Sequence, residues 1–335
     1  MRRAPVLAAC LAVVGLVASA APGAAATVDR IAGTNQYETA IAVSQRTVRD
    51  PALSSRVAVL VSGDDAADVL AAPAVAINNG TDFENGNVSA PILMIPTGQG
   101  LTRQVEAELR RLELQTLYIL GGTNKVSRAA QDQARAFVPT VERIAGADRY
   151  ETAVKVSQRY ATPGGAVVVT TGESPTEALP GVKAAGGTPL LLTRKDSLPA
   201  ATANELKRLR PTRVVVVGGT GVVSTAVRRA VEAAATGAVV TRIGGADRYA
   251  TDLAVTQSSD NEPYVVVLTS GETWQNAVVA SAFSVSDDVA GTRLLTKRDC
   301  VPSASVDYIT SRQLAVTVVG GPGNVSDAAA NLTRC

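Results

Sequence analysis

Short apolar runs alternate with amphipathic stretches along most of the chain. Runs rich in β-branched residues, such as VAVLVS before Gly63, have the length of a buried strand. In LTRQVEAELRRL, the apolar positions Leu101, Val105, Leu109 and Leu112 fall on one stripe of a helix. Continuous apolar strands that alternate with helices predict parallel sheets covered on both faces, and therefore an α/β fold.

The same order of elements occurs three times. A first run ends in Gly-Asp or Gly-Glu, at Asp64, Glu173 and Glu272. A second run follows as PILMI, PLLLT or RLLT, and a third run ends in Gly-Gly. A Val-Ser pair comes next, and its serine is predicted to cap a helix, at Ser127, Ser224 and Ser326. We therefore predict three tandem repeats, each a small parallel sheet flanked by helices.

One phrase recurs in every repeat, which we call the signature. It reads RIAGTNQYETAIAVSQ from Arg30, RIAGADRYETAVKVSQ from Arg143 and RIGGADRYATDLAVTQ from Arg242. Asp148 with Glu151 fits a capping box, so the signature is predicted to open a helix. The first repeat carries the longest insertion, 78–90, which is rich in Gly and Asn and is predicted to be a surface loop.

These landmarks divide the chain into a signal peptide, 1–26, and repeats over 27–140, 141–239 and 240–335. Arg2 and Arg3 precede an apolar run, and Ala24-Ala25-Ala26 fits the cleavage rule for exported proteins. We expect a mature, secreted chain from Thr27 without a transmembrane segment. Three repeats fill this length, so no separate catalytic domain is expected.

The amino-acid composition excludes several classes of catalytic and binding site. The 335 residues contain no histidine, which removes Ser-His-Asp and Cys-His catalysis and the commonest metal ligand. No metal and no cofactor are expected. Without Arg2 and Arg3, the 32 basic residues become 30, equal to the 30 acidic residues. Such a chain lacks the basic field expected of nucleic-acid binders, so local clusters must hold any anionic ligand.

Cys300 and Cys335 remain after signal cleavage, and Cys335 is predicted to end the last helix of the third repeat. An even pair in an exported chain favours one disulfide. Two free thiols are the alternative. A disulfide would hold the C-terminal helix within the third repeat.

Candidate ligand-binding residues lie in the signatures and in the Gly-Gly turns. Signature arginines could hold an acidic group, and the tyrosines could stack on a sugar. The alternative is internal pairing and packing. The turns run from strand to helix, so their amides could cradle an anion, although tight geometry alone also explains them. The candidates are Arg30, Tyr37, Arg143, Arg149, Tyr150, Arg242, Arg248, Tyr249, Gly121, Gly122, Gly218, Gly219, Gly320 and Gly321.

Acidic residues follow the first strand of each repeat, and paired carboxylates can hydrolyse glycosidic bonds. They are Asp64, Asp65, Glu173 and Glu272, followed by Asp68, Glu177 and, breaking the pattern, Asn276. Helix capping explains them more simply. Basic residues after the second strand are interpreted as solvated loop charges: Arg194, Lys195, Lys297 and Arg298. We predict a chain that is not an enzyme.

The signature, the strand ending TTGE, PLLLT and VVVVGGTGVVS resemble the cell-wall-binding repeat 2 family of Gram-positive surface proteins. The resemblance covers nearly the whole mature chain. It implies a pseudo-threefold arrangement of α/β domains and non-covalent attachment to an anionic wall polymer at the cell surface. Gln36, where the other signatures have arginine, departs from the family pattern.

Three weak sites on one body would give avidity for a repeating polymer, which accounts for the triplication. The leading interpretation is therefore a secreted wall-binding protein whose partner is a wall polymer, either an anionic glycan or peptidoglycan. The alternatives are an enzyme acting on wall glycan or peptide and a purely structural surface protein.

Overall fold

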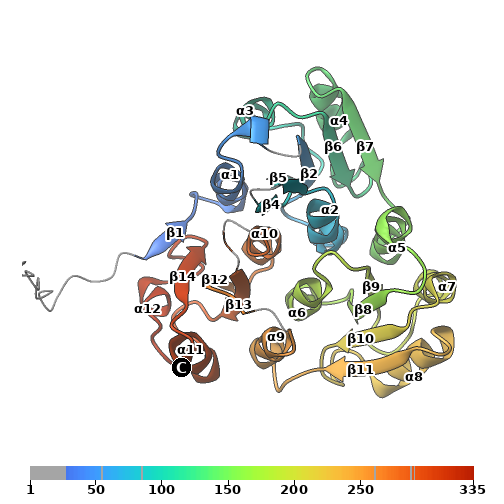
Figure 1. The fold of residues 1–335 in the computed structure, drawn as a ribbon. Coiled ribbons are helices and arrows are strands. Elements are labelled where there is room, and N and C mark those ends of the chain that lie inside the picture. Colours follow the sequence, from blue (N-terminus) through green and yellow to red (C-terminus); the bar gives the residue numbers. More distant parts are fainter. Residues whose placement is uncertain (1–27, 54–55, 84–85, 260–261, 287–288, 290) are drawn as a thin grey trace, which may run out of the picture.

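The computed structural model describes residues 28–335, except 54–55, 84–85, 260–261, 287–288 and 290. The predicted signal peptide lies outside the described residues. Three α/β units occupy the corners of a triangle around a pseudo-threefold axis (Figure 1). The helices nearest the axis are seen nearly end-on. The prediction of three repeats with small parallel sheets is confirmed.

Each unit contains a four-stranded parallel sheet. In unit 1 the strand order is β5 (Ile92–Ile95), β2 (Val57–Ser62), β6 (Thr116–Leu120) and β7 (Thr140–Ile144). In unit 2 it is β9 (Leu190–Thr193), β8 (Ala166–Thr171), β10 (Arg213–Val217) and β11 (Val239–Ile243). In unit 3 it is β13 (Gly291–Thr296), β12 (Val265–Ser270), β14 (Ala315–Val319) and β1 (Asp29–Ile31).

The last strand of each sheet was not predicted. It contains the Arg-Ile that opens the next signature, so the strand of one repeat completes the sheet of the repeat before it. In unit 3 this strand comes from the start of the chain, where Arg30 pairs with Val318 of β14. The sequence repeat and the folded unit are therefore offset by one strand, and the pairing of β1 with β14 closes the ring.

Helices cover both faces of each sheet. The outer helices are α3 (Arg103–Arg111), α4 (Arg128–Arg135), α7 (Ala200–Leu209), α8 (Thr225–Ala234), α11 (Ser303–Ser311) and α12 (Asp327–Ala330). The signature helices are α1 (Gln36–Thr47), α5 (Arg149–Tyr160) and α9 (Arg248–Gln257). The central helices are α2 (Ala72–Asn78), α6 (Pro175–Ala185) and α10 (Gln275–Phe283). Short 3-10 turns occur at Pro51–Leu53 and Val69–Ala71.

Each outer face has its own apolar core, while the inner faces meet in the middle of the molecule. The outer cores contain Leu109 in unit 1, Val231 in unit 2 and Ile309 in unit 3. One inner cluster includes Val75 of α2, Leu179 of α6 and Val279 of α10, so it joins all three units. The central helices approach closely because they are rich in small residues.

The insertion in the first repeat differs from its prediction as a loop. Residues Thr81–Phe83 (β3) and Gly86–Val88 (β4) pair as an antiparallel hairpin. The short strands lie outside the parallel sheet, and their polar, Gly-rich sequence gave no apolar period by which to recognise them.

The predicted disulfide between Cys300 and Cys335 is present, with 5.3 Å between the Cα atoms. The last helix ends earlier than predicted, at Ala330. The remaining residues return toward the loop after β13, where Val301 forms a bridge with Arg334. The disulfide thus fixes the end of the chain to this loop.

Reducing this disulfide should destabilise unit 3 by about 4 kcal/mol, because it closes a long loop with a sequence separation of 35. Thermal unfolding with and without reductant measures the effect. The variant Cys300→Ser/Cys335→Ser should match the reduced protein and show no response to reductant. Ser197 is the natural counterpart of Cys300 in unit 2, so the serine is compatible with this loop. Equal melting temperatures for oxidised and reduced protein would contradict the prediction.

Candidate functional site

The first arginine of each signature lies on the last strand of a sheet and reaches the Gly-Gly turn of the sequence repeat that this strand completes. Arg30 donates to the carbonyl oxygens of Gly320 and Val325 at 2.7 and 2.8 Å. In the other two units, Arg143 donates to Gly121 at 2.6 Å and Arg242 donates to Gly218 at 2.5 Å. In all three sheets, these guanidinium groups therefore tie the strand contributed by one sequence repeat to the turn of another repeat.

The following residues of the signature shape the start of its helix. The signature helices α1, α5 and α9 are capped by the side chains of Asn35, Asp148 and Asp247. These side chains accept hydrogen bonds from backbone N–H groups in the first turn of each helix. The preceding glycine lies against the first turn: a Cβ on Gly146 would stand 2.3 Å from the Cβ of Glu151. Its N–H donates to the hydroxyl of Thr152 at 2.9 Å. The recurrence of this phrase therefore follows largely from local geometry.

The second arginine binds the end of the first strand of its own unit and, in unit 3, also reaches the neighbouring unit. Arg149 and Arg248 donate to the carbonyl oxygens of Gly172 and Gly271 at 2.6 and 2.9 Å. Arg248 also forms an ion pair with Glu177 of unit 2, with an N–O distance of 2.6 Å.

The third junction replaces this arrangement with neutral groups. The first signature has Gln36, and Asn276 stands where unit 2 has Glu177. The carbonyl oxygen of Gly63 accepts instead from the side chain of Gln275 at 3.3 Å. Gln36 and Asn276, which both looked like defects in the repeat, thus occur at the same junction and leave no unpaired charge there.

The ion pair between Arg248 and Glu177 should stabilise its junction by about 1 kcal/mol, because both side chains are about three-quarters buried. A double-mutant cycle with Arg248→Gln and Glu177→Gln, read by denaturant unfolding, measures the coupling. The exposed pair of Arg110 and Glu106 on α3 is the control, and its coupling should stay below about 0.5 kcal/mol. Equal coupling in both cycles would contradict this assignment.

The signature tyrosines pack against the glycine at the end of each first strand. A Cβ on Gly63, Gly172 or Gly271 would stand 2.6 to 2.8 Å from a tyrosine ring carbon. Tyr150 and Tyr249 are buried, and the ring of Tyr150 lies 5.2 Å from the guanidinium of Arg194.

Each tyrosine also faces the acidic residue of its own unit. Tyr37 donates its hydroxyl to Asp64. Burial and this bond raise the pKa of Tyr37 to about 12. Burial and the charges of Glu173 and Glu272 raise the pKa values of Tyr150 and Tyr249. All three phenols therefore stay protonated and act as donors or packing groups at neutral pH.

The first glycine of each Gly-Gly turn uses its backbone groups in hydrogen bonds to the Arg-Ile strand beside it. Gly121, Gly218 and Gly320 have φ angles of +99°, +122° and +126°, which favour glycine. Their N–H groups donate to the carbonyl oxygens of Ile144, Ile243 and Ile31 at 2.9 to 3.0 Å. The second glycines, Gly122, Gly219 and Gly321, accept from the backbone of the following turn. The predicted roles of these turns, tyrosines and arginines in ligand binding stay predictions.

The loops at the carboxyl ends of the strands repeat one contact. The exposed side chains of Asp64, Glu173 and Glu272 accept from the N–H groups of Thr97, Lys195 and Arg298 at 2.9 to 3.2 Å. In units 2 and 3 this bond holds two neighbouring exposed cations after the second strand. We call these residues the carboxyl-edge surface: Asp64, Glu173, Glu272, Arg194, Lys195, Lys297 and Arg298.

The three parts of this surface occupy equivalent positions in the three units, which are arranged around the pseudo-threefold axis (Figure 1). The same kind of loop is therefore presented three times around that axis.

No metal-binding group of three or more His, Cys, Asp or Glu side chains occurs among the described residues. None of the helices in this part of the chain is both long and apolar enough to cross a membrane.

Comparison with known proteins identifies relatives of the chain. N-acetylmuramoyl-L-alanine amidase LytC of Bacillus subtilis (strain 168) is 28% identical over 275 residues, which are 81% of this chain and 49% of that protein. The amidase enhancer of the same organism is 26% identical over 304 residues, or 90% of this chain and 39% of that protein. The chain thus spans half or less of the length of these curated relatives.

Solved structures share the fold. Cwp6 from Clostridium difficile has a TM-score of 0.75 and 24% identity, covering 91% of this chain and 48% of its own. Cwp8 from the same organism has a TM-score of 0.76 and 23% identity, covering 91% and 51%. A model of the family described as cell wall binding domain 2 matches residues 30–131, 143–228 and 242–330. These matches follow the three repeats and take in most of the chain, which therefore belongs to the cell wall binding domain 2 family.

Proposed function

We propose that the chain attaches non-covalently to the bacterial cell wall by binding an anionic wall polymer along the carboxyl-edge surface. The observation that carries the proposal is the repetition of the same loop contact in three units arranged around one axis. Arg194, Lys195, Lys297 and Arg298 place exposed cations in two of the three loops, and Arg298 is also ion-paired with Asp299 at 2.7 Å. A repeating polyanion can contact both basic loops at once, so weak contacts combine into stable retention.

In this proposal the signature residues position the loops. The arginines hold the Gly-Gly turns and the tyrosines lie under the strand ends, while the exposed cations meet the polymer. Unit 1 has Thr97 where units 2 and 3 have Lys195 and Arg298, so it contributes least. Polymer binding should then weaken as salt concentration rises, because exposed charges are screened.

We further propose that the matched chain binds rather than cleaves. Two relatives are named as an amidase and an amidase enhancer, but this chain covers only 49% and 39% of them. The carboxylates of the carboxyl-edge surface bond to loop amides in the same way in all three units. Such repetition supports a structural role. We also propose export to the surface of a Gram-positive cell, supported by the sequence pattern of residues 1–26.

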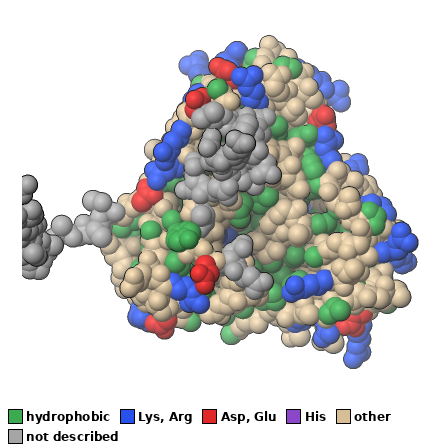
Figure 2. Space-filling view, viewed as in Figure 1, with side chains coloured by type: hydrophobic (Ala, Val, Ile, Leu, Met, Phe, Trp, Pro, Cys, Tyr) green, Lys and Arg blue, Asp and Glu red, His purple; other side chains and the backbone are tan. Residues whose placement is uncertain are grey.

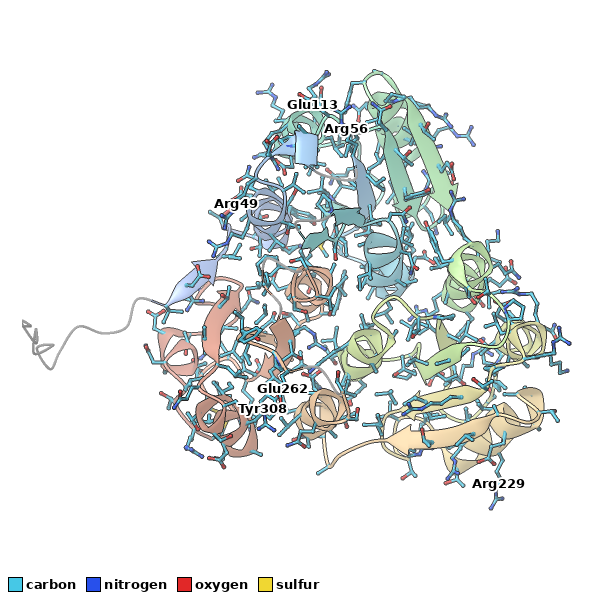
Figure 3. The ribbon with its side chains drawn as sticks, viewed as in Figure 1. Arg49, Arg56, Glu113, Arg229, Glu262 and Tyr308 are labelled. Atoms are coloured by element: carbon cyan, nitrogen blue, oxygen red, sulfur yellow. A yellow bond between two sulfur atoms is a disulfide. The ribbon has the colours of Figure 1, made fainter. Side chains whose placement is uncertain are left out.

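Sedimentation with purified walls tests the proposal. The variant Arg194→Gln/Lys195→Thr/Lys297→Gln/Arg298→Thr removes the exposed cations and uses the threonine found in unit 1. The control replaces four other exposed cations by Gln. Two of them, Arg49 and Arg229, are labelled in Figure 3, and the others are Lys207 and Arg312. The first variant should lose at least about tenfold in wall affinity, while the control binds like the unmodified chain.

Walls stripped of anionic polymers by hydrofluoric acid identify the ligand. Retention by intact walls and its loss on stripped walls supports the proposal. Equal retention by intact and stripped walls would show that the ligand is peptidoglycan and not an anionic polymer. Release of soluble sugar or peptide in the same tubes would favour the enzyme instead.

A further inference from the structure

Three buried charged residues break the threefold repetition between units 2 and 3. They are Lys183 of α6, Asp252 of α9 and Arg293 of β13, and we call them the buried charge cluster. At the corresponding positions the other repeats have only apolar residues: Ala74 and Ala282, Ala40 and Ala153, and Ile92 and Leu190. Packing of the shared fold therefore does not require this cluster.

The cluster contains two cations and one carboxylate. Arg293 donates to Asp252 at 2.7 Å, and both side chains are fully buried. The ammonium of Lys183 lies 3.5 Å from the other oxygen of Asp252 and donates to the hydroxyl of Thr256. That carboxylate oxygen also accepts from the N–H of Leu295 at 3.0 Å. One positive charge is thus left over in a buried place, where it is costly.

Arg293 also has unused hydrogen-bonding capacity. One terminal nitrogen donates to Asp252 and to the carbonyl oxygen of Leu179 at 3.0 Å. The other terminal nitrogen and Nε are buried and lack a partner among the described residues. Buried donors in folded proteins are nearly always bonded, so two orphaned donors on one guanidinium point to a missing acceptor.

The cluster adjoins a cavity of about 630 Å³ where the first residues of β8, β10 and β13 come together. Lys183 is 11% exposed at its wall, and Arg293 lies beside it. Val182, Val215 and Val255 provide apolar lining. On the face seen in Figure 2, hydrophobic side chains lie in the middle and most Lys and Arg side chains lie toward the edge.

Two further charged residues line the cavity. Arg213 and Glu262 are exposed, and Glu262 lies between α9 and β13 (Figure 3). They offset each other, so the lining and Asp252 together keep one net positive charge. The volume is in the range of small-molecule sites.

We propose that this cavity binds a small, partly apolar carboxylate, whose single negative charge offsets the excess charge of the buried cluster. Lys183 reaches the carboxylate from the cavity wall, and Arg293 supplies its two unpaired donors. The apolar part of the ligand packs against the valines. The site opens at the amino ends of the strands, so it is separate from the carboxyl-edge surface and does not depend on the proposed wall binding.

The protonation of Lys183 gives an independent readout. Burial and the charge of Arg293 together lower the pKa of Lys183 to about 8, although Asp252 opposes the shift. A bound carboxylate stabilises the ammonium form, so the pKa should rise on binding. Calorimetry near pH 8 in buffers of different ionisation enthalpy should therefore detect proton uptake with the ligand.

Titration of the full chain with three probes tests the proposal. NMR of the arginine Nε–H signals and calorimetry monitor the binding. The probes are N-acetyl-D-alanyl-D-alanine for a peptide end, glucuronate for an acidic sugar and inorganic phosphate. One carboxylate probe should bind with a Kd in the millimolar range or tighter and shift the Arg293 signal. The carboxylate that binds identifies the source of the ligand.

The matched variant is Arg293→Leu, which installs the residue found in unit 2. It should lose at least about tenfold in affinity for the carboxylate while sedimenting with walls like the unmodified chain. If Arg293→Leu fails to fold, Lys183→Met provides the same comparison through loss of proton uptake. Absence of saturable binding, unchanged binding by the folded variants, or binding of phosphate alone would overturn the proposal.

Discussion

Replacing Asp252 with alanine, its counterpart in the other two repeats, should destabilise the protein by about 3–5 kcal/mol. Asp252 is the carboxylate that faces both Lys183 and Arg293, and its side chain is fully buried. Its removal leaves two cations in a low-dielectric environment with one fewer partner. Denaturant unfolding of the wild-type and variant chains measures the difference, and hydrogen exchange should place the loss at α6, α9 and β13.

The triple variant Lys183→Ala/Asp252→Ala/Arg293→Leu separates this effect from the loss of packing. It converts the junction to the apolar residues used elsewhere in the chain, so it should recover most of the stability lost by Asp252→Ala alone. The recovery is expected because replacement of a buried ionic cluster by apolar residues is often neutral or stabilising. A triple variant less stable than the single variant would refute this account.

Removal of the ring-closing strand should produce the second large effect. A chain that starts at Thr34 lacks β1, including Ile31, which is buried, and Arg30, which holds the turn of unit 3. We expect a loss of at least about 3 kcal/mol from apolar burial and hydrogen bonds. Hydrogen exchange should show faster exchange in β14, while β6 and β10 keep their protection because their neighbours remain.

The open edge of β14 should also make this shorter chain associate. Unpaired strand edges pair readily with other chains, and sedimentation velocity would detect the oligomers. A synthetic peptide of residues 27–35 should restore stability and reverse this association by occupying the edge. The matched control is a chain that starts at Thr27, which retains β1. Equal stability of the two chains would show that β1 does not close the ring.

Local features were readable from the sequence. The apolar runs, the capping residues Ser127, Ser224 and Ser326 and the triplication all depend on residues near one another in the chain, and the structure contains each of them. The pairing of Thr81–Phe83 with Gly86–Val88 was missed because these short polar strands carry no apolar period. The strand that opens each signature was missed because its partner belongs to another repeat.

For the candidate site, the recurring residues could be recognised in the sequence, whereas their contact partners could not. The recurrence of arginine, glycine and tyrosine was visible, but their partners were not, because Arg30 and Gly320 lie at opposite ends of the chain. The buried charge cluster had a signal in the sequence: charged residues at Lys183, Asp252 and Arg293 replace apolar ones in the other copies. Each change stands alone in the sequence, and only the packing of α6, α9 and β13 brings them together.

The sequence by itself therefore determined the repeat, the α/β class and the family, since these follow from periodicity and from motifs within a short stretch. The tertiary structure decided how the ring closes, why Gln36 and Asn276 occur together and where one unpaired positive charge is buried. These properties depend on contacts between units, and the energy of such contacts depends on distances and burial that the order of residues does not contain.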